Sequence, residues 1–301
     1  MPERADNEQL PLALDVEAFM IDCQVRNLSP KTLGVYRYQL DRFLAWRSCQ
    51  AGPVTAHEVR AYLLALRGVV SPSTQHQAFR VLRTFCRWTV AEGLWEANPM
   101  ERLKPPKLAD RPLPPVPIED VRAMIATCDR SLLGLRDVAL MLALLDTAAR
   151  ASELLGCDVG DADLRSGALV LRHTKEGRVR VTFLGSRARR TLLRYLRDRG
   201  DLAGDAAMQA SPLFATRDGG RLSYWGLRQV LRRRAEKAGV PAPGAHAFRR
   251  AACLAMLRNG ADVFSVQALA GHADLATTRR YLKLAQDDLA EAHRKHGPVD
   301  R

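Results

Sequence analysis

A proline-rich stretch between Pro99 and Pro117 divides this chain of 301 residues. Seven of the 16 prolines lie there. Proline fixes φ, lacks an amide donor and disfavours helix in the residue before it, so the stretch should be extended. We therefore expect two domains, residues 10–98 and residues 118–301, joined by a linker over residues 99–117.

The first domain shows helical patterns and no strand pattern. Ser29-Pro30 and Ser71-Pro72 are helix start signals. Apolar residues recur at helical spacing after both signals. We predict four helices, over residues 15–26, 29–44, 55–66 and 71–93. This domain should be all-helical.

The second domain combines helices with a short β segment. Residues 178–183 alternate apolar and polar side chains, and we expect them to pair with residues 168–172 across a turn at residues 173–177. Asp262 and Asp274 have the residue type of helix N-caps, and Gly271 is placed to end a helix. Helices are predicted over residues 118–128, 132–145, 186–199, 223–238, 246–259, 262–270 and from 274 onward. The predicted fold class is mainly α with a small antiparallel β-sheet.

The charge of the chain points to a polyanionic partner. The formal net charge is +13, with 46 basic and 33 acidic side chains. Residues 1–110 hold 14 of the basic and 12 of the acidic groups, so the excess lies in the second domain. Arginine greatly outnumbers lysine, and its planar fork of donors suits phosphate oxygens. These features favour nucleic acid as the partner.

Other classes of protein fit the sequence poorly. No apolar run reaches the roughly 18 residues that a membrane span needs, and residues 132–145 are interrupted by Arg136 and Asp137. Residues 1–15 lack the features of a signal peptide, so we expect a soluble protein of the cytoplasm. The cysteines form no CxxC pair, which argues against a disulfide framework or a zinc site. They are Cys23, Cys49, Cys86, Cys128, Cys157 and Cys253.

Candidate chemical groups gather in the second domain. Tyr281 lies near the end of the sequence, and its hydroxyl needs a base or a strongly cationic site to attack, because a free phenol has a pKa of about 10. His246 and Arg249 stand three residues apart, so they should share one helix face. His272 directly follows Gly271 at a predicted corner between helices.

Arg150 and Lys175 complete the set of candidates. Arg150 follows an apolar helix, where Glu153 could pair with it. Lys175 lies in the predicted hairpin turn, among several other basic residues. Taken singly, each candidate has an ordinary structural role: a packing tyrosine, a surface helix, a capping histidine, an ion pair, a lysine in a turn.

Together the candidates have the chemistry of a phosphoryl transfer without a metal ion. Such a reaction needs cations around the phosphate, a nucleophile, and an acid for the departing oxygen. Arg150 and Arg249 could fork onto the two non-bridging oxygens. Lys175 could protonate the leaving hydroxyl, and the two histidines could donate or carry protons. Tyr281 would supply the attacking oxygen.

The order Arg, Lys, His-x-x-Arg, Gly-His, Tyr resembles that of the tyrosine recombinase family, which includes phage integrases and Xer-type recombinases. The resemblance spans about residues 15–285. The most specific piece is LAGHADLATTRRYLK at residues 269–283, where the tyrosine follows the histidine by nine residues. The other pieces are TAARASEL around Arg150, RHTKEGRVRVTF around Lys175, and HAFRR at residues 246–250.

Three positions depart from the family's pattern. Family members usually have Thr-Gly where this chain has Thr147-Ala148, and HxLRH where it has HAFRR. They often have a second histidine two residues after the tyrosine, where this chain has Lys283. None of these changes removes a candidate catalytic group.

The resemblance implies a SAM-like, four-helix core-binding domain and an α+β catalytic domain that together clamp duplex DNA at a specific recombination site. It implies a reaction through a 3′-phosphotyrosyl link, with Tyr281 as nucleophile, and a Holliday junction, with no cofactor. Family members act as tetramers on two DNA sites, built from one recombinase or from two. The catalytic residues that it implies are Arg150, Lys175, His246, Arg249, His272 and Tyr281.

Two other functions remain open at this point. A type IB-like DNA topoisomerase shares the chemistry, although the separate helical domain and the length of the chain favour recombination. A catalytically silent DNA-binding protein derived from a recombinase should have lost at least one catalytic group, and all six are present. The sequence leaves integration, excision and dimer resolution equally open.

Overall fold

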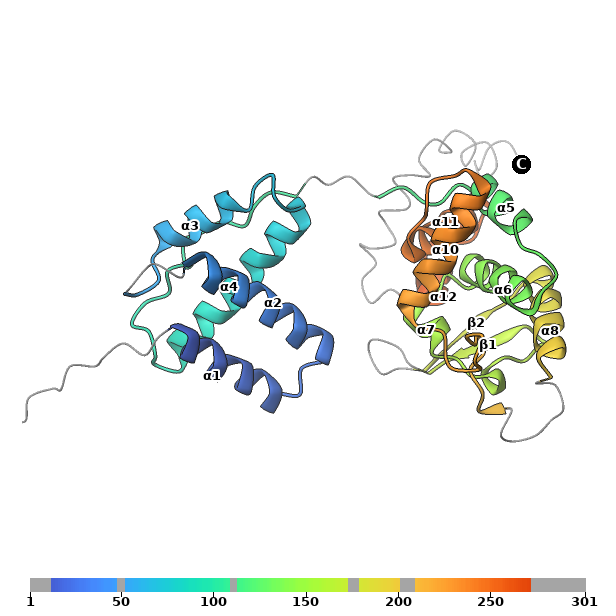
Figure 1. Ribbon diagram of the computed structural model, residues 1–301, viewed down its shortest axis with the longest axis horizontal. Helices are drawn as coiled ribbons and strands as arrows, with labels where there is room; N and C mark the ends of the chain where they lie inside the picture. The colour runs from blue at the N-terminus through green and yellow to red at the C-terminus, as the bar shows by residue number, and fades with distance from the viewer. Residues whose placement is uncertain (1–11, 48–51, 109–112, 173–178, 201–208, 272–301) are drawn as a thin grey trace, which may run out of the picture. The chain divides into compact units, whose positions relative to one another are not determined.

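The structure is a computed structural model, and it describes residues 12–47, 52–108, 113–172, 179–200 and 209–271. The chain forms two compact units, Met1–Arg111 and Pro112–Arg301, which divide inside the proline-rich stretch (Figure 1). Both units are mostly helical, and the second holds a two-stranded antiparallel sheet. The predicted fold class is therefore confirmed. The finer domain bounds, residues 10–98, 99–117 and 118–301, stay a prediction.

Four helices make up the described part of the first unit. They are α1 (Leu12–Val25), α2 (Pro30–Arg47), α3 (Ala56–Ala65) and α4 (Pro72–Ala91). Ser71 caps α4, because its Oγ accepts a hydrogen bond from the amide of Thr74 at 3.1 Å. Thr55 and Glu58 form a capping box at the start of α3. The four predicted helices are confirmed, with small shifts at their ends.

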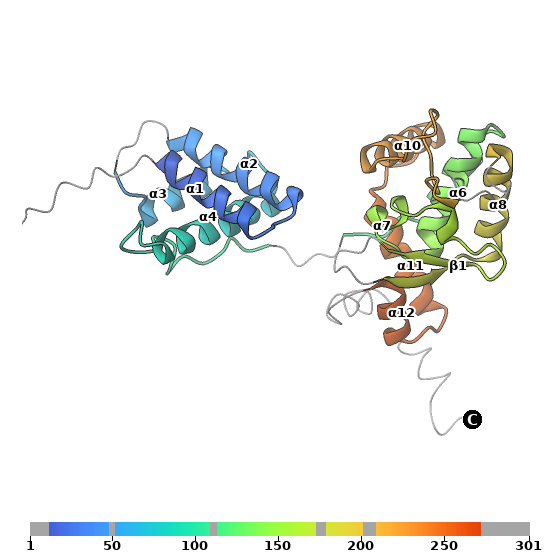
Figure 2. The ribbon, with the colours of Figure 1, turned by 90° about the horizontal axis from the view of Figure 1, so that it is seen from below.

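Aromatic side chains form the core of the first unit. Phe19 of α1 stacks on Tyr36 of α2 with 5.6 Å between ring centroids, and it meets Phe85 of α4 edge-on at 5.5 Å. Figure 2 shows these three helices packed together. Met100 is fully buried in the same core, so the start of the proline-rich stretch packs on this unit.

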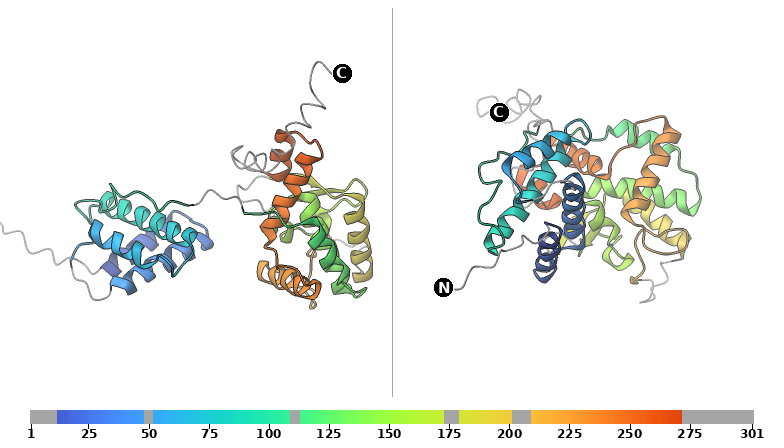
Figure 3. Two further views of the ribbon diagram at one scale, coloured as in Figure 1. Left: turned by 90° about the horizontal axis from the view of Figure 1, so that it is seen from above. Right: turned by 60° about the vertical axis from the view of Figure 1, so that its left-hand side comes forward.

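The elements described in the second unit are α5 (Ile118–Ala126), α6 (Leu132–Thr147), α7 (Ala151–Leu155), the 3-10 turn η1 (Val159–Asp161), β1 (Ala168–Leu171), β2 (Arg180–Phe183), α8 (Ser186–Arg199), α10 (Tyr224–Ala238), α11 (Ala245–Arg258) and α12 (Val263–Ala270). This unit is built around α6, which contacts α8, α11 and β2. In β1 and β2, Ala168 stands opposite Phe183 and Leu171 opposite Arg180. Figures 2 and 3 show α10 and α12 at opposite ends of the unit, with α11 between them.

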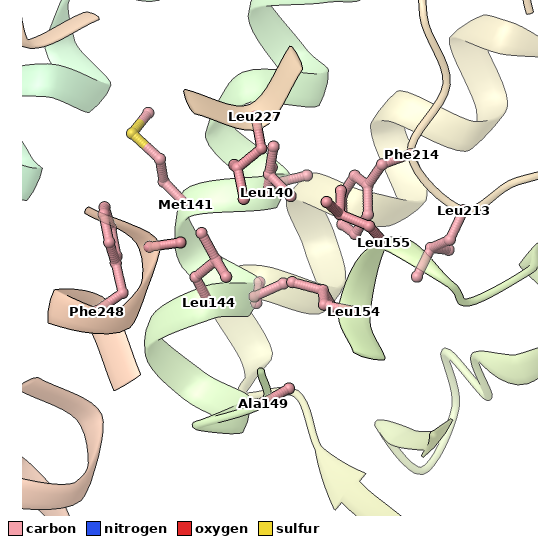
Figure 4. Packing of buried hydrophobic residues seen from close by; sticks show 14 of the residues in the cluster. Leu140, Met141, Leu144, Ala149, Leu154, Leu155, Leu213, Phe214, Leu227 and Phe248 are labelled. Carbon is pink, nitrogen blue, oxygen red and sulfur yellow. The ribbon is translucent and has the colours of Figure 1, made fainter. Parts of the chain in front are cut away.

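Apolar packing fixes α7 and α11 to α6. Leu140 and Leu144 of α6 are almost fully buried. Figure 4 shows them among Leu154 of α7, Leu227 of α10 and Phe248 of α11. Burying side chains of this size contributes roughly 1.5–3 kcal/mol each. The two elements that position Arg150 and Arg249 therefore share one core.

A buried ion cluster joins α6 to α10. Arg136 and Asp137, which interrupt the apolar run in the sequence, are 4% and 0% exposed. Asp137 Oδ1 accepts Nη2 of Arg136 at 2.7 Å, and its Oδ2 accepts Nε of Arg234 at 2.9 Å. Each of these guanidiniums also donates to a backbone carbonyl oxygen. Each oxygen of the Asp137 carboxylate is paired with a cation, and this pairing offsets the free-energy cost of burying the charges.

The structure corrects the predicted elements around the end of α6. This helix runs past residue 145 to Thr147, whose Oγ1 donates to the carbonyl oxygen of Ala143 at 2.6 Å. α7 and η1 have no counterpart among the predicted elements, because elements of five and three residues are too short to show a helical repeat. α5 and β1 end one or two residues before their predicted ends, as frayed termini commonly do. Among the described residues, no helix has the length and apolar character needed to cross a bilayer.

Candidate active site

The site begins at Ala148, where α6 ends in a sharp turn. Its φ of 48° and ψ of 17° are left-handed, a conformation that costs a non-glycine residue roughly 1–2 kcal/mol. Its side chain is fully buried, in a small cluster that includes Cys253 of α11 and Val266 of α12. Tyrosine recombinases usually have glycine here, and the positive φ explains that preference.

Arg150 follows this turn as the residue before α7. Its Nη1 donates to Oε1 of Glu153 at 2.7 Å, and its Nη2 donates to the carbonyl oxygen of Gly271 at 3.0 Å. The backbone amide of Arg150 donates to the other oxygen of Glu153 at 3.0 Å. The predicted Arg150–Glu153 pair is present. The side chain of Arg150 stays 28% exposed, so a ligand can reach part of it.

Glu153 is shared by two arginines. It is 1% exposed, and its Oε2 accepts Nη2 of Arg180 at 2.6 Å. Burial acts to raise the pKa of the Glu153 carboxyl, but the hydrogen bonds from Arg150 and Arg180 outweigh burial and hold that pKa below its usual range. The carboxylate is therefore ionised at neutral pH and balances one of the cations around it.

Arg249, on α11, is 1% exposed. Its Nη1 donates to the carbonyl oxygen of Ala148 at 2.7 Å. Burial and then the cation of Arg150 lower the pKa of the Arg249 guanidinium to about 10. At neutral pH it is still protonated. Because Ala148 lies two residues before Arg150, this hydrogen bond places Arg249 at the turn that leads into Arg150.

His246 lies one turn before Arg249 on α11. Desolvation and then the cations of Arg249, Arg250 and Arg150 lower the pKa of its imidazole. His246 is therefore mostly neutral at pH 7, and a neutral imidazole can both donate and accept a proton. Its exposed position leaves it accessible to a substrate.

The structure thus brings together three of the six predicted catalytic residues, Arg150, His246 and Arg249. Lys175, His272 and Tyr281 lie outside the described residues. The helix predicted from residue 274 onward also lies outside them.

The end of α12 closes the described part of the site. Asp262 caps this helix by accepting the amide of Phe264 at 2.8 Å, as predicted. Gly271 ends it with φ +65°, also as predicted. A Cβ at residue 271 would lie 2.8 Å from Nε of Arg180, so the position needs glycine for space as well as for conformation.

Arg180 is a site residue that was not among the predicted ones. It begins β2, where Thr182 is buried while Val181 and Phe183 are exposed. Its two terminal nitrogens donate to Glu153 and to the carbonyl oxygen of Leu269. The sequence shows that apolar and polar residues alternate along this strand. It does not show that the polar face is the buried one, because the apolar face of a strand normally turns inward.

The arrangement is suited to binding a tetrahedral anion. The described site holds three guanidiniums, of Arg150, Arg180 and Arg249, against one ionised carboxylate, Glu153. Arginine forks match phosphate oxygens, and donors fixed in advance stabilise the charge that develops during phosphoryl transfer. His246 adds a neutral imidazole that can act as a general acid or base.

Comparison with known proteins matches both units to one family. Residues 116–287 match the phage integrase family, and residues 16–95 match the phage integrase N-terminal SAM-like domain. The tyrosine recombinase XerC of Pelobacter propionicus is 32% identical over 300 residues, which are 97% of this chain and 97% of that protein. The tyrosine recombinase XerD of Ralstonia nicotianae is 30% identical over 277 residues, 90% of this chain and 89% of that protein.

Solved structures share the fold at lower identity. XerH site-specific recombinase bound to its palindromic difH substrate has a TM-score of 0.73 at 17% identity, covering 96% of this chain and 90% of that one. A lambda integrase dimer bound to a COC′ core site has a TM-score of 0.72 at 18% identity, covering 89% and 94%. The motifs, the fold and the full-length relatives agree. The chain therefore belongs to the phage integrase family of tyrosine site-specific recombinases.

Proposed function

We propose that this chain cleaves and rejoins duplex DNA at a specific site with Tyr281 as the nucleophile. The observation that carries the proposal is the meeting of Arg150 and Arg249. Arg150 directly precedes α7 and donates to Glu153, whereas Arg249 lies on α11 and donates to Ala148 in the turn just before Arg150. XerC and XerD relatives over nearly the whole chain support recombination, and structures of the same fold bound to DNA support DNA as the substrate.

In the proposed reaction, Oη of Tyr281 attacks the scissile phosphorus. The new bond to tyrosine forms as the bond between phosphorus and the 5′ oxygen breaks. The phenolic proton passes to one of the two site histidines, and the departing 5′ oxygen takes a proton from Lys175. The products are a 3′-phosphotyrosyl link and a free 5′-hydroxyl. The 5′-hydroxyl of a second strand then attacks this link, restores the DNA backbone and releases the tyrosine.

Arg150 and Arg249 bind the non-bridging oxygens in this proposal. Both are fixed by protein acceptors before substrate arrives, so little reorganisation is needed in the transition state. Each exchange replaces one ester bond by another, so no nucleotide cofactor is needed. His246, neutral and exposed beside them, is placed for proton transfer.

The first unit offers a surface for the DNA backbone. Arg80, Arg83 and Arg87 of α4 recur at helical spacing. With His76 and Phe79 they line a hollow of about 400 Å³. Basic side chains on one helix face suit phosphates, and such contacts position a protein on DNA without reading its sequence. DNA affinity should therefore fall steeply as salt rises.

The proposed assembly is a tetramer on two DNA sites, of this chain alone or with a second recombinase. Ultracentrifugation of the protein with a duplex carrying its site tests this stoichiometry. Four protein copies with two duplexes support the assembly, and a final complex of one copy with one duplex contradicts it. The cytoplasm stays the predicted location.

A plasmid assay separates recombination from the two rival functions. The cognate site is first recovered by binding the protein to fragmented DNA of the cell that encodes it. With two directly repeated copies of that site on one plasmid, recombination releases the intervening DNA as a second circle. A type IB-like topoisomerase would relax a supercoiled plasmid that lacks the site, and a silent DNA-binding protein would do neither. Relaxation without circle formation would overturn the proposed function.

A further inference from the structure

Arg180 connects three segments that are separate in the sequence. It lies at the start of β2, and its side chain is 15% exposed. Nη2 donates to Oε2 of Glu153, which lies in α7, at 2.6 Å. Nη1 donates to the carbonyl oxygen of Leu269 in α12. One side chain thus ties the β-sheet to both elements that contact Arg150.

The same contacts commit Arg180 to the protein. Both terminal nitrogens donate to protein acceptors, and Nε is buried with no acceptor among the described residues. Gly271 packs against the side chain of Arg180, since a Cβ at residue 271 would lie within 2.8–3.2 Å of Nε, Cδ and Cζ of Arg180. The guanidinium of Arg180 is therefore packed among protein groups that fix its position.

Arg150 depends on the groups that Arg180 holds. Its Nη1 donates to Glu153, the carboxylate that also accepts Arg180, and its Nη2 donates to the carbonyl oxygen of Gly271. Arg180 binds Leu269, two residues before Gly271. Both acceptors of Arg150 are therefore fixed by Arg180, one directly and one through the backbone at the end of α12. His272 follows that backbone directly in the sequence.

We propose that Arg180 is a positioning residue for strand cleavage: it holds Glu153 and the end of α12 so that the Arg150 guanidinium points toward the scissile phosphate. This inference rests on the proposed function, because it assigns Arg180 a part in that reaction. Displacing a reacting group by about 1 Å can slow a reaction by roughly 100-fold. Losing the anchor of Arg150 should therefore slow cleavage without weakening DNA binding.

The test is single-turnover formation of the covalent adduct on a nicked duplex that carries the cognate site, at saturating protein. Arg180→Gln should react about 10 to 100 times more slowly than wild type, with a DNA dissociation constant within about threefold. Arg47→Gln is the matched control. Arg47 is 6% exposed and also binds a carboxylate and a backbone carbonyl oxygen, but in the first unit. It should cleave at the wild-type rate.

A double-mutant cycle distinguishes positioning from general support of the fold. If Arg180 acts through Arg150, then Arg180→Gln should cost no more than about threefold in an Arg150→Lys background. An equal cost in both backgrounds would overturn the inference. So would wild-type cleavage by Arg180→Gln. If melting curves show that Arg180→Gln is unfolded, Arg180→Lys takes its place in the same cycle, because it keeps the charge and loses the fork.

The two levels of the proposal fail in different ways. If the wild-type protein forms no adduct on its site, the proposed function is wrong. If the wild-type protein forms the adduct and Arg180→Gln forms it equally fast, only the role of Arg180 is wrong.

Discussion

Arg249 donates a hydrogen bond from Nη1 to the carbonyl oxygen of Ala148 at 2.7 Å. The acceptor residue has φ +48°, and the donor is 1% exposed. The turn that ends α6 therefore also supplies the acceptor that fixes a buried cation. The geometry of the turn and the position of the guanidinium are coupled.

Replacing Ala148 by glycine tests the cost of this turn. Glycine adopts positive φ without strain, so relief of roughly 1–2 kcal/mol should offset the lost methyl packing and the greater flexibility of the unfolded chain. Ala149→Gly is the control, since Ala149 is equally buried and has no positive φ. In urea unfolding, Ala148→Gly should be the more stable variant by about 1 kcal/mol. If the two variants were equally stable, the claim that Ala148 is strained in this turn would be wrong.

His246 should titrate below the usual range of histidine in the free protein. Desolvation and the cations of Arg249, Arg250 and Arg150 lower the pKa of its imidazole. Arg250→Gln removes one of these cations, so the pKa should rise toward the ordinary value of about 6.5. Proton NMR of the imidazole, assigned with His246→Gln, measures both values. A pKa above the ordinary range in wild type, or a fall in Arg250→Gln, would show that the electrostatic account is wrong.

The folding consequence of His246 has a defined sign. A histidine with a lowered pKa in the folded state binds fewer protons there than in the unfolded chain. Its contribution to stability is present above the unfolded pKa of about 6.5 and is lost as pH falls toward the folded pKa. The wild-type protein should therefore lose more stability in that interval than His246→Gln does. Thermal melts of both proteins across about pH 5 to 7, where histidine ordinarily titrates, measure this difference in stability.

The role proposed for Lys175 predicts a chemical rescue. An alkoxide is a poor leaving group, because the pKa of an aliphatic hydroxyl lies far above that of a thiol, which is about 8.5. Lys175→Ala should therefore cleave normal DNA at least about 100 times more slowly. A site with sulfur in place of the bridging 5′ oxygen should restore most of that loss. Arg150→Ala is the control, because this variant loses a cation that binds the phosphate and keeps Lys175, the proposed acid. Equal rescue of both variants would remove Lys175 from the acid role.

Asp137 should be essential for stability. It is fully buried and accepts hydrogen bonds from Arg136, Arg233 and Arg234. Asp137→Asn leaves two buried guanidiniums without a counter-charge, which should cost about 3–5 kcal/mol in urea unfolding. Asp198→Asn removes an exposed partner of Arg197 and should cost less than about 1 kcal/mol. Similar losses in the two variants would contradict the importance of burial.

Much of the fold could be predicted because its helices carry clear local signals. Ser71, Asp262 and Gly271 mark helix ends by their residue type, and the structure uses each of them in that way. The helix α7 has only five residues, too few to show a helical repeat in the sequence. The end of α6 depends on a left-handed alanine, which local propensity disfavours, so tertiary packing decides that turn.

The site was less predictable than the fold. Arg150, His246 and Arg249 stand out by their spacing and by the family order, and they do meet. Arg180 has no comparable motif. Its importance arises from contacts with Glu153 and Leu269, which are far from it in the sequence, on the inward face of a strand whose apolar side is exposed. Long-range pairing of this kind leaves no local signal.

The most direct test of the account is the identity of the nucleophile. Wild-type protein, incubated with a nicked duplex carrying its site, should form a covalent adduct, and mass spectrometry after proteolysis should place the nucleotide on the peptide that contains Tyr281. Tyr281→Phe should bind the same duplex with unchanged affinity and form no adduct. An adduct formed by Tyr281→Phe, or one mapped to another residue, would contradict the account.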